Sequence, residues 1–238
     1  MTADDKPELD LSHVPLFPLP GVVLFPRAVL PLHIFEDRYR AMTADVLVRD
    51  EKLIAMALLK PGWEKSYYGR PEIEPVVCVG RILSHEMLPD GKYNFLLQGQ
   101  LRARILSEKG GRPSDKTPYR VARLAALEEI PALEIDLPDQ RDLLLDLFST
   151  SALAQSGAGK QFRQIIKTPL ATPDVADLAA FTFLECPITK QRLLAEPDVR
   201  LRVHQAVAAL QRLAAELSHK PPQPKSFSVG QPPDPTVN

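Results

Sequence analysis

The sequence predicts an α+β protein in which a β-rich part, roughly residues 12–130, precedes an all-helical part, roughly residues 135–218. Two observations lead to this prediction. Residues 93–105 alternate between apolar and polar side chains, which is the period of a strand with one buried face. Towards the C-terminus, apolar residues recur at spacings of three and four from Val203 to Leu217, which is typical of an amphipathic helix.

The β-rich part begins with a run of prolines and apolar residues at positions 14–31. Proline blocks a helix, so this run predicts extended chain and turns. Apolar residues then recur at spacings of four, three and four within residues 35–46, which predicts a helix over positions 36–49. The wholly apolar run Leu53–Leu59 predicts a strand that is buried on both faces.

A tight hairpin is the clearest local prediction. Asp90-Gly91 lies between two strand-like runs, residues 76–88 and 93–106, and the glycine supplies the positive φ that such a turn needs. In the second run, Arg102 and Arg104 fall on the polar positions of the alternation, so we expect both on a solvated strand face. A further strand is expected within residues 119–130.

The helical part contains several recognisable boundaries. A helix is predicted over residues 139–148, and Gly157–Gly159 is expected to form a loop after it. Another helix should begin at Thr172, whose side chain suits the N-cap position before a proline. The long helical pattern of residues 189–217 is expected to divide at positions 196–198, where a proline interrupts it.

Composition excludes several classes of protein. Of the 238 residues, 45% are hydrophobic and 25% are charged, which is ordinary for a globular domain. The formal net charge of −1 lacks the basic excess of a typical nucleic-acid binder. Cys78 and Cys186 both lie in apolar runs, so we expect two free, buried thiols in a reducing compartment.

The two ends of the chain differ from the rest. We expect residues 1–11 to be a disordered lead and residues 219–238, which contain six prolines, to be a disordered proline-rich tail. The polar start has no apolar segment of signal-peptide length, and no run approaches the ~18 apolar residues of a membrane span. These features predict a cytoplasmic location and no membrane partner.

No catalytic residue, metal site or cofactor is predicted. Residues 156–161 resemble a phosphate-binding loop, but Ala154 and Gln161 occupy the positions that require glycine and a hydroxyl residue. The histidines lack zinc-site spacing. The alternative is a small-molecule-binding or hydrolytic enzyme whose residues meet only in the folded chain, and Cys78, His33 and His85 are its first candidates.

Aromatic residues in a polar loop are the best candidates for binding. Trp63, Tyr67 and Tyr68 lie within residues 61–71, and an exposed tryptophan beside tyrosines is typical of a contact surface. The structural alternative is that this loop simply packs over the mouth of the β-rich part. Phe25 and Arg102 are further binding candidates, although a solvated strand face explains Arg102 equally well.

Several motifs resemble the substrate-binding, or N-terminal, domain family of Lon proteases. They are the run Pro15–Pro26, the segment Leu30–Tyr39, the turn Leu88–Gly91, the Gly99-x-x-Arg102 pattern and the segment Lys190–Glu196. The similarity extends over about residues 12–217 and is closest to small stand-alone bacterial members. One departure is Arg27, which stands where these proteins commonly have glycine.

The resemblance implies a PUA-like β-barrel followed by a helical bundle. It also implies a recognition module for unfolded or extended polypeptide in protein quality control, with a protease or chaperone as a further partner. The ATPase and Ser–Lys protease domains of full-length Lon have no counterpart in these motifs, so we expect no enzyme activity. We expect binding in a groove between barrel and bundle, with the aromatic loop at its rim. An RNA-binding or nucleotide-binding PUA-like protein is the alternative.

Overall fold

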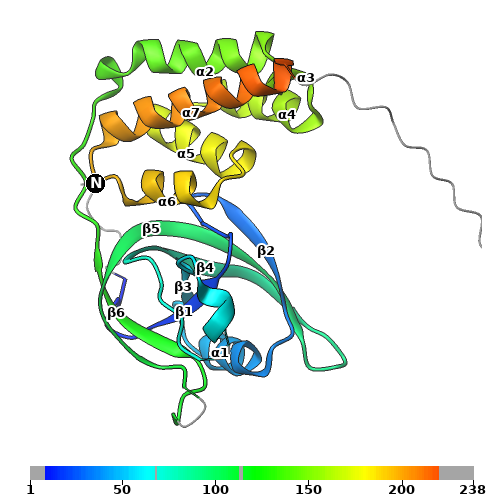
Figure 1. Ribbon diagram of the computed structural model, residues 1–238, viewed down its shortest axis with the longest axis vertical. Helices are drawn as coiled ribbons and strands as arrows, with labels where there is room; N and C mark the ends of the chain where they lie inside the picture. The colour runs from blue at the N-terminus through cyan, green and yellow to red at the C-terminus, as the bar shows by residue number, and fades with distance from the viewer. Residues whose placement is uncertain (1–8, 68, 113–114, 220–238) are drawn as a thin grey trace, which may run out of the picture.

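A computed structural model describes residues 9–67, 69–112 and 115–219 of the chain. Figure 1 shows two layers, with the strands and α1 (Asp37–Leu47) on one side and the remaining helices on the other. Tyr68 and most of the expected lead and tail lie outside the described residues. Those predictions therefore stay untested.

The strands and helices follow the predicted order along the chain. The strands are β1 (Val14–Leu19), β2 (Val29–Ile34), β3 (Leu53–Leu58), β4 (Val76–Met87), β5 (Tyr93–Gly110) and β6 (Arg120–Ala126). The helices after them are α2 (Pro138–Thr150), α3 (Ala152–Gln155), α4 (Gly157–Ile166), α5 (Thr172–Phe183), α6 (Pro187–Ala195) and α7 (Val199–His219). Within the described part of the chain, no helix has the length and apolar character needed to cross a membrane.

The strands form a mixed sheet in the order β2-β5-β4-β3-β1-β6. β6 also pairs with β5, so the pairings among β5, β4, β3, β1 and β6 make a closed circuit. β1 and β3 are parallel, whereas the other pairs are antiparallel. β2 and β6 therefore lie on the same side of β5, at different points along its length.

The prediction that the strand at Leu53–Leu59 is buried on both faces is confirmed. Every residue of β3 is buried. Ile54 and Met56 belong to one core cluster, while Ala55 and Ala57 belong to a second cluster. The alternation of the strand places successive side chains on opposite faces, so each face meets its own packed layer.

One apolar core connects the sheet to the helices. The larger cluster contains Phe17 and Met42 from the sheet side together with Leu144 and Val203 from the helical layer. The two layers therefore pack directly on each other. The division into a β-rich domain and a helical domain stays a prediction.

The predicted hairpin is present, with Gly91 at φ 75° in the turn between β4 and β5. The solvated position expected for Arg102 is wrong, because only 6% of this residue is exposed. Arg104 is exposed as predicted. The alternation identifies the polar face of β5, but it cannot show that helices of the second layer cover that face at Arg102.

Two local predictions for the helical part also need correction. Gly157–Gly159 is the first turn of α4, because the hydroxyl of Ser156 accepts a hydrogen bond from the Gly159 amide at 2.9 Å and caps the helix. α5 includes Thr172 and has Ala171 as its N-cap. The predicted division of the last helical pattern is confirmed by the break between α6 and α7.

The two cysteines differ in burial. Cys78 is fully buried in β4, as expected, but Cys186 is exposed immediately before α6. Its apolar sequence neighbours indicated burial, yet Cys186 lies in the short connection between two helices rather than inside either.

Candidate functional site

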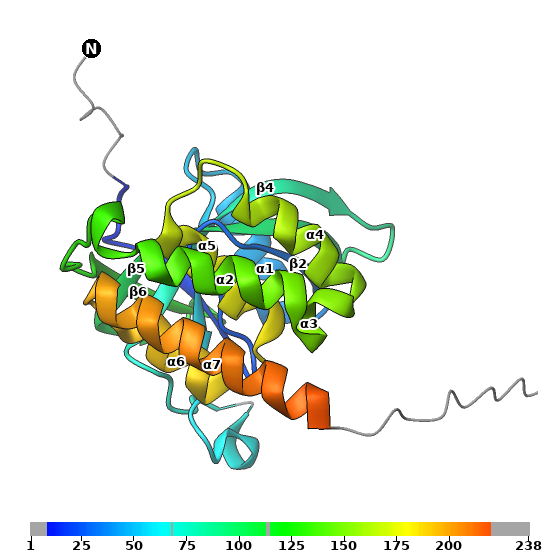
Figure 2. The ribbon, with the colours of Figure 1, turned by 90° about the horizontal axis from the view of Figure 1, so that it is seen from above.

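Two openings lie where the sheet meets the helical layer, and the first is an apolar groove of about 460 Å³. Its walls include Leu58, Trp63, Pro75, Val76, Ile188 and Ala195, and we call it the apolar groove. Figure 2 shows the short cyan turn that begins at Trp63 projecting from the body of the molecule on the side where α6 lies. The groove thus lies between a loop of the sheet side and α6.

The apolar groove has a fixed floor and an uncovered apolar wall. Gln191 of α6 donates a buried hydrogen bond of 2.9 Å from Nε2 to the carbonyl oxygen of Val76, which joins α6 to β4. Ile188, on the same helix, is 53% exposed. Charge is sparse here, with Glu74 and Arg192 as the charged lining residues. The groove is therefore suited to apolar side chains rather than to ions.

Trp63 is held in place by the turn that carries it and by contacts with neighbouring side chains. Gly62 has φ 89°, and this left-handed conformation starts the turn that carries Trp63. The Trp63 ring packs edge-to-face against Tyr67, with centroids 5.6 Å apart. The Tyr67 hydroxyl donates a 2.5 Å hydrogen bond to Glu36, and Arg38 lies over the Tyr67 ring. The aromatic loop is thus anchored to the start of α1.

The predicted aromatic residues have different positions. Trp63 lines the apolar groove, whereas Tyr67 lies behind it and lines a small hollow beside Arg38. Partial burial and the hydrogen bond to Glu36 raise the pKa of Tyr67. Tyr67 therefore positions Trp63, and the binding roles of both residues stay predictions. Tyr68 lies outside the described residues.

The second opening is a cleft of about 490 Å³ between β5 and helices α5 and α7. We call it the charged cleft, and its charged lining residues are Arg27, Arg102, Glu129, Asp174, Asp177 and Arg202. At its rim, Arg27 Nε lies 2.7 Å from Asp174 Oδ2. Arg27 has φ 65°, a left-handed backbone conformation that glycine adopts more readily than arginine.

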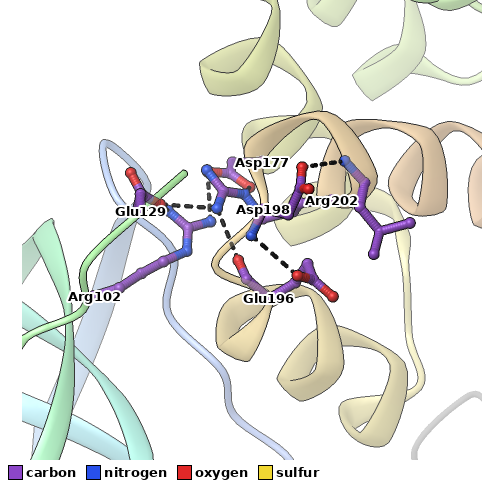
Figure 3. Close-up of polar contacts among 7 residues, drawn as sticks. Arg102, Glu129, Asp177, Glu196, Asp198 and Arg202 are labelled. Carbon is purple, nitrogen blue, oxygen red and sulfur yellow. Dashed lines mark hydrogen bonds and ion pairs between the residues drawn. The ribbon is translucent and has the colours of Figure 1, made fainter. Parts of the chain in front are cut away.

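A group of four charged side chains crosses the charged cleft (Figure 3). Arg102 Nη2 lies 2.6 Å from Asp177 Oδ2, and Arg202 Nη1 lies 2.8 Å from Glu129 Oε1. Glu129 also lies 3.5 Å from Arg102 Nη1. Burial raises the pKa of Asp177, and the two guanidinium groups offset this effect only in part. The group links β5, α5, α7 and the segment after β6.

Phe25, one of the binding candidates, lies in the core. Its side chain is fully buried, and the Arg102 guanidinium carbon lies 6.0 Å from its ring centroid. Gly99 of β5 approaches the backbone so closely that a Cβ atom there would lie 2.0 Å from the Phe25 carbonyl oxygen. Phe25 therefore supports the charged cleft from within the core and presents no surface to a ligand.

The three side chains of the enzyme alternative do not form one constellation. Cys78 is fully buried, and burial raises its pKa to about 12. His33 and His85 line a separate pocket on the hairpin, where His33 Nδ1 lies 2.7 Å from Asn94 Oδ1. No hydrogen bond joins any two of the three within residues 9–67, 69–112 and 115–219. In those same ranges, no cluster of histidine, cysteine and acidic residues could hold a metal ion.

Sequence reasoning missed several residues of both openings. Asp177 carried a signal, because it is the one acidic residue within the apolar run 175–184. A buried acid in such a helix needs a cationic partner, but the sequence does not identify Arg102, which lies 75 positions earlier. Ile188 follows Pro187 in an ordinary amphipathic pattern and carried no signal for the apolar groove.

The comparisons with known proteins identify the family. The profile of the ATP-dependent protease La (LON) substrate-binding domain matches residues 13–212. The chain belongs to this family. The N-terminal domain of the Mycobacterium avium complex Lon protease superimposes with a TM-score of 0.64 at 17% identity, covering 84% of this chain and 98% of that chain. A Lon N-terminal domain protein from Xanthomonas campestris superimposes with a TM-score of 0.60 at 21% identity, over 83% and 98% of the two chains.

Among curated relatives, the Lon protease of Desulfosudis oleivorans is 25% identical over 219 residues, which is 92% of this chain and 25% of the relative. The Lon protease of Escherichia coli K12 is 31% identical over 108 residues, or 44% of this chain and 14% of the relative. The chain thus spans about a quarter or less of these Lon proteases. Membership of the Lon substrate-binding family supports a substrate-recognition module.

Proposed function

We propose that this chain binds extended or unfolded polypeptide in the apolar groove and does not cleave it. The observation that carries the proposal is the open apolar wall formed by Trp63 and Ile188 in a protein of the Lon substrate-binding family. An unfolded polypeptide exposes apolar side chains, and their burial against such a wall stabilises binding by about 25 cal/mol per Å² of apolar surface. Because Tyr67 anchors it, Trp63 needs little reordering to accept a ligand.

The proposal includes the wider role. The bound polypeptide passes to a separate protease or chaperone in protein quality control, and this takes place in the cytoplasm. It also includes a finer description of the fold, in which the closed circuit of strand pairings is a PUA-like barrel and helices α2–α7 form a bundle. The groove then lies between the barrel and the bundle.

A binding experiment with matched variants tests the site. Fluorescence anisotropy of a fluorescein-labelled apolar peptide should give an affinity about tenfold weaker for Trp63→Ala than for the natural chain, because a buried aromatic contact is lost. Phe35→Ala is the control, since Phe35 is 60% exposed and does not line the groove. Equal losses in both variants, or no loss in either, contradict the assignment of the groove.

Two further arms test the remaining parts of the proposal. Casein incubated with the purified chain should stay intact on a gel, and degradation that persists after contaminating proteases are excluded contradicts the absence of cleavage. A labelled single-stranded RNA should bind weakly at most. Tight RNA binding that falls steeply with salt would favour the RNA-binding alternative instead.

A further inference from the structure

The four charged side chains of the charged cleft differ in how firmly they are held. The side chains of Arg102, Asp177 and Arg202 are 4%, 5% and 3% exposed, and they come from β5, α5 and α7. Glu129 is 38% exposed and comes from the segment that follows β6. Three members are therefore fixed within the protein, whereas the Glu129 carboxylate can turn outward into solvent.

The backbone beside Glu129 does not need to move for this to happen. Ile130 is fixed by two hydrogen bonds, one of 2.9 Å from its amide to the Pro197 carbonyl and one of 3.1 Å from the Val199 amide to its own carbonyl. Rotation of the Glu129 side chain alone would remove its carboxylate from Arg102 and Arg202. The fixed members would then carry two positive charges and one negative charge.

Each of the two arginines has an Nε–H group that makes no hydrogen bond to the described residues. Arg102 Nε is buried without a hydrogen-bond partner in the described part of the chain. Arg202 Nε lies 3.6 Å from Asp177 Oδ1, which is too long for a hydrogen bond. A planar guanidinium offers five N–H donors in a geometry that matches the two oxygens of a carboxylate. The pair is thus suited to a carboxylate ligand in the place of Glu129.

The cleft also has room for the chain that precedes a carboxylate. β2 pairs with β5 as far as Gln98, and β6 pairs with β5 from Ala103 onward. Among the residues that the structure describes, no strand pairs with Gln100 or Leu101 on that side, and both residues line the cleft. An extended peptide can lie along such an unpaired strand edge. The volume of about 490 Å³ lies within the range of ligand pockets.

We propose that the charged cleft binds the C-terminal carboxylate of a polypeptide, with Arg102 and Arg202 as its donors and Glu129 as an internal stand-in that the ligand displaces. The last residues of the ligand lie beside Gln100 and Leu101. This site is separate from the apolar groove, although its ligand class rests on the proposed function.

Peptides that differ only at their end test this proposal. A fluorescein-labelled apolar peptide with a free C-terminal carboxylate should bind the natural chain about tenfold more tightly than its C-terminally amidated form at low salt. Equal affinities for the two forms would overturn the proposal. An amidated peptide with a glutamate side chain near its end should bind like the plain amide, and acetate at the same concentration should not compete. Tighter binding of the glutamate peptide than of the plain amide, or competition by acetate, would assign the cleft to carboxylates in general rather than to a chain terminus.

Glu129→Gln provides the matched variant. It keeps the shape of the side chain but removes the competing charge, so the affinity for the free-carboxylate peptide should rise about tenfold while that for the amide stays constant. Unchanged affinities in a variant that retains the thermal midpoint of the natural chain would contradict the stand-in role. Trp63→Ala separates this result from the proposed function, because Trp63 lines the apolar groove and not the charged cleft, so the variant should preserve the tenfold preference for the free carboxylate.

Discussion

The apolar groove and the charged cleft lie between the same two layers, yet they are built in opposite ways. Trp63 and Ile188 leave apolar surface open to a ligand, whereas Arg102 and Asp177 already satisfy each other's charge. A ligand gains burial in the groove without displacing anything. In the cleft it must displace Glu129 from Arg102 and Arg202, so the cleft should select for charge and geometry while the groove should tolerate many sequences.

The largest expected effect concerns the stability of the charged cleft. Asp177→Ala leaves Arg102 and Arg202 buried with Glu129 as their remaining acidic partner, and we expect a loss of about 4 kcal/mol in the free energy of unfolding. Asp174→Ala is the control, because its partner Arg27 is 55% exposed and such a pair contributes at most about 1 kcal/mol. Urea unfolding of both variants measures the difference. Similar losses of unfolding free energy in the two variants would show that the buried ion pairs stabilise the fold no more than the exposed pair does.

The next largest effect concerns the reactivity of the two cysteine thiols, because each cysteine lies beside a different opening. Cys186 adjoins Pro187 in the wall of the apolar groove, and its hydrogen bond with Thr189 lowers its pKa. Cys78 lies behind the charged cleft, where burial raises its pKa to about 12. Since the thiolate is the reactive form, iodoacetamide at neutral pH should modify Cys186 at least about 100-fold faster.

Mass spectrometry of the labelled chain follows both sites at once. An apolar peptide should slow the labelling of Cys186, and urea should expose Cys78. Rapid labelling of Cys78 in the folded chain would contradict its burial, and peptide binding without protection of Cys186 would separate that ligand from the groove.

The smallest effect concerns the rim of the charged cleft at Arg27. A residue other than glycine costs about 1 kcal/mol at φ 65°, so Arg27→Gly should be about 1 kcal/mol more stable than Arg27→Ala. Both variants lose the ion pair with Asp174, which makes them a matched pair. Thermal unfolding compares them directly. An alanine variant as stable as the glycine variant would show that this backbone position is not strained.

The order of the strands and helices could be predicted from the sequence because each depends on local patterns. The wholly apolar run at Leu53 and the Asp90-Gly91 turn are examples, and the aromatic loop indicated Trp63. The charged cleft could not be predicted, since Arg102 and Asp177 meet only through the packing of α5 on β5. The alternation in β5 showed which face is polar but not what covers that face.

The emission of Trp63 provides the most direct test of polypeptide binding in the apolar groove. Trp63 is the single tryptophan of the chain and lies in the groove wall, so its fluorescence reports on this site alone. Titration with an apolar peptide that lacks tryptophan should shift the emission to shorter wavelength, with the same dissociation constant that anisotropy gives for the peptide. Peptide binding detected by anisotropy with no change in Trp63 emission would contradict the account.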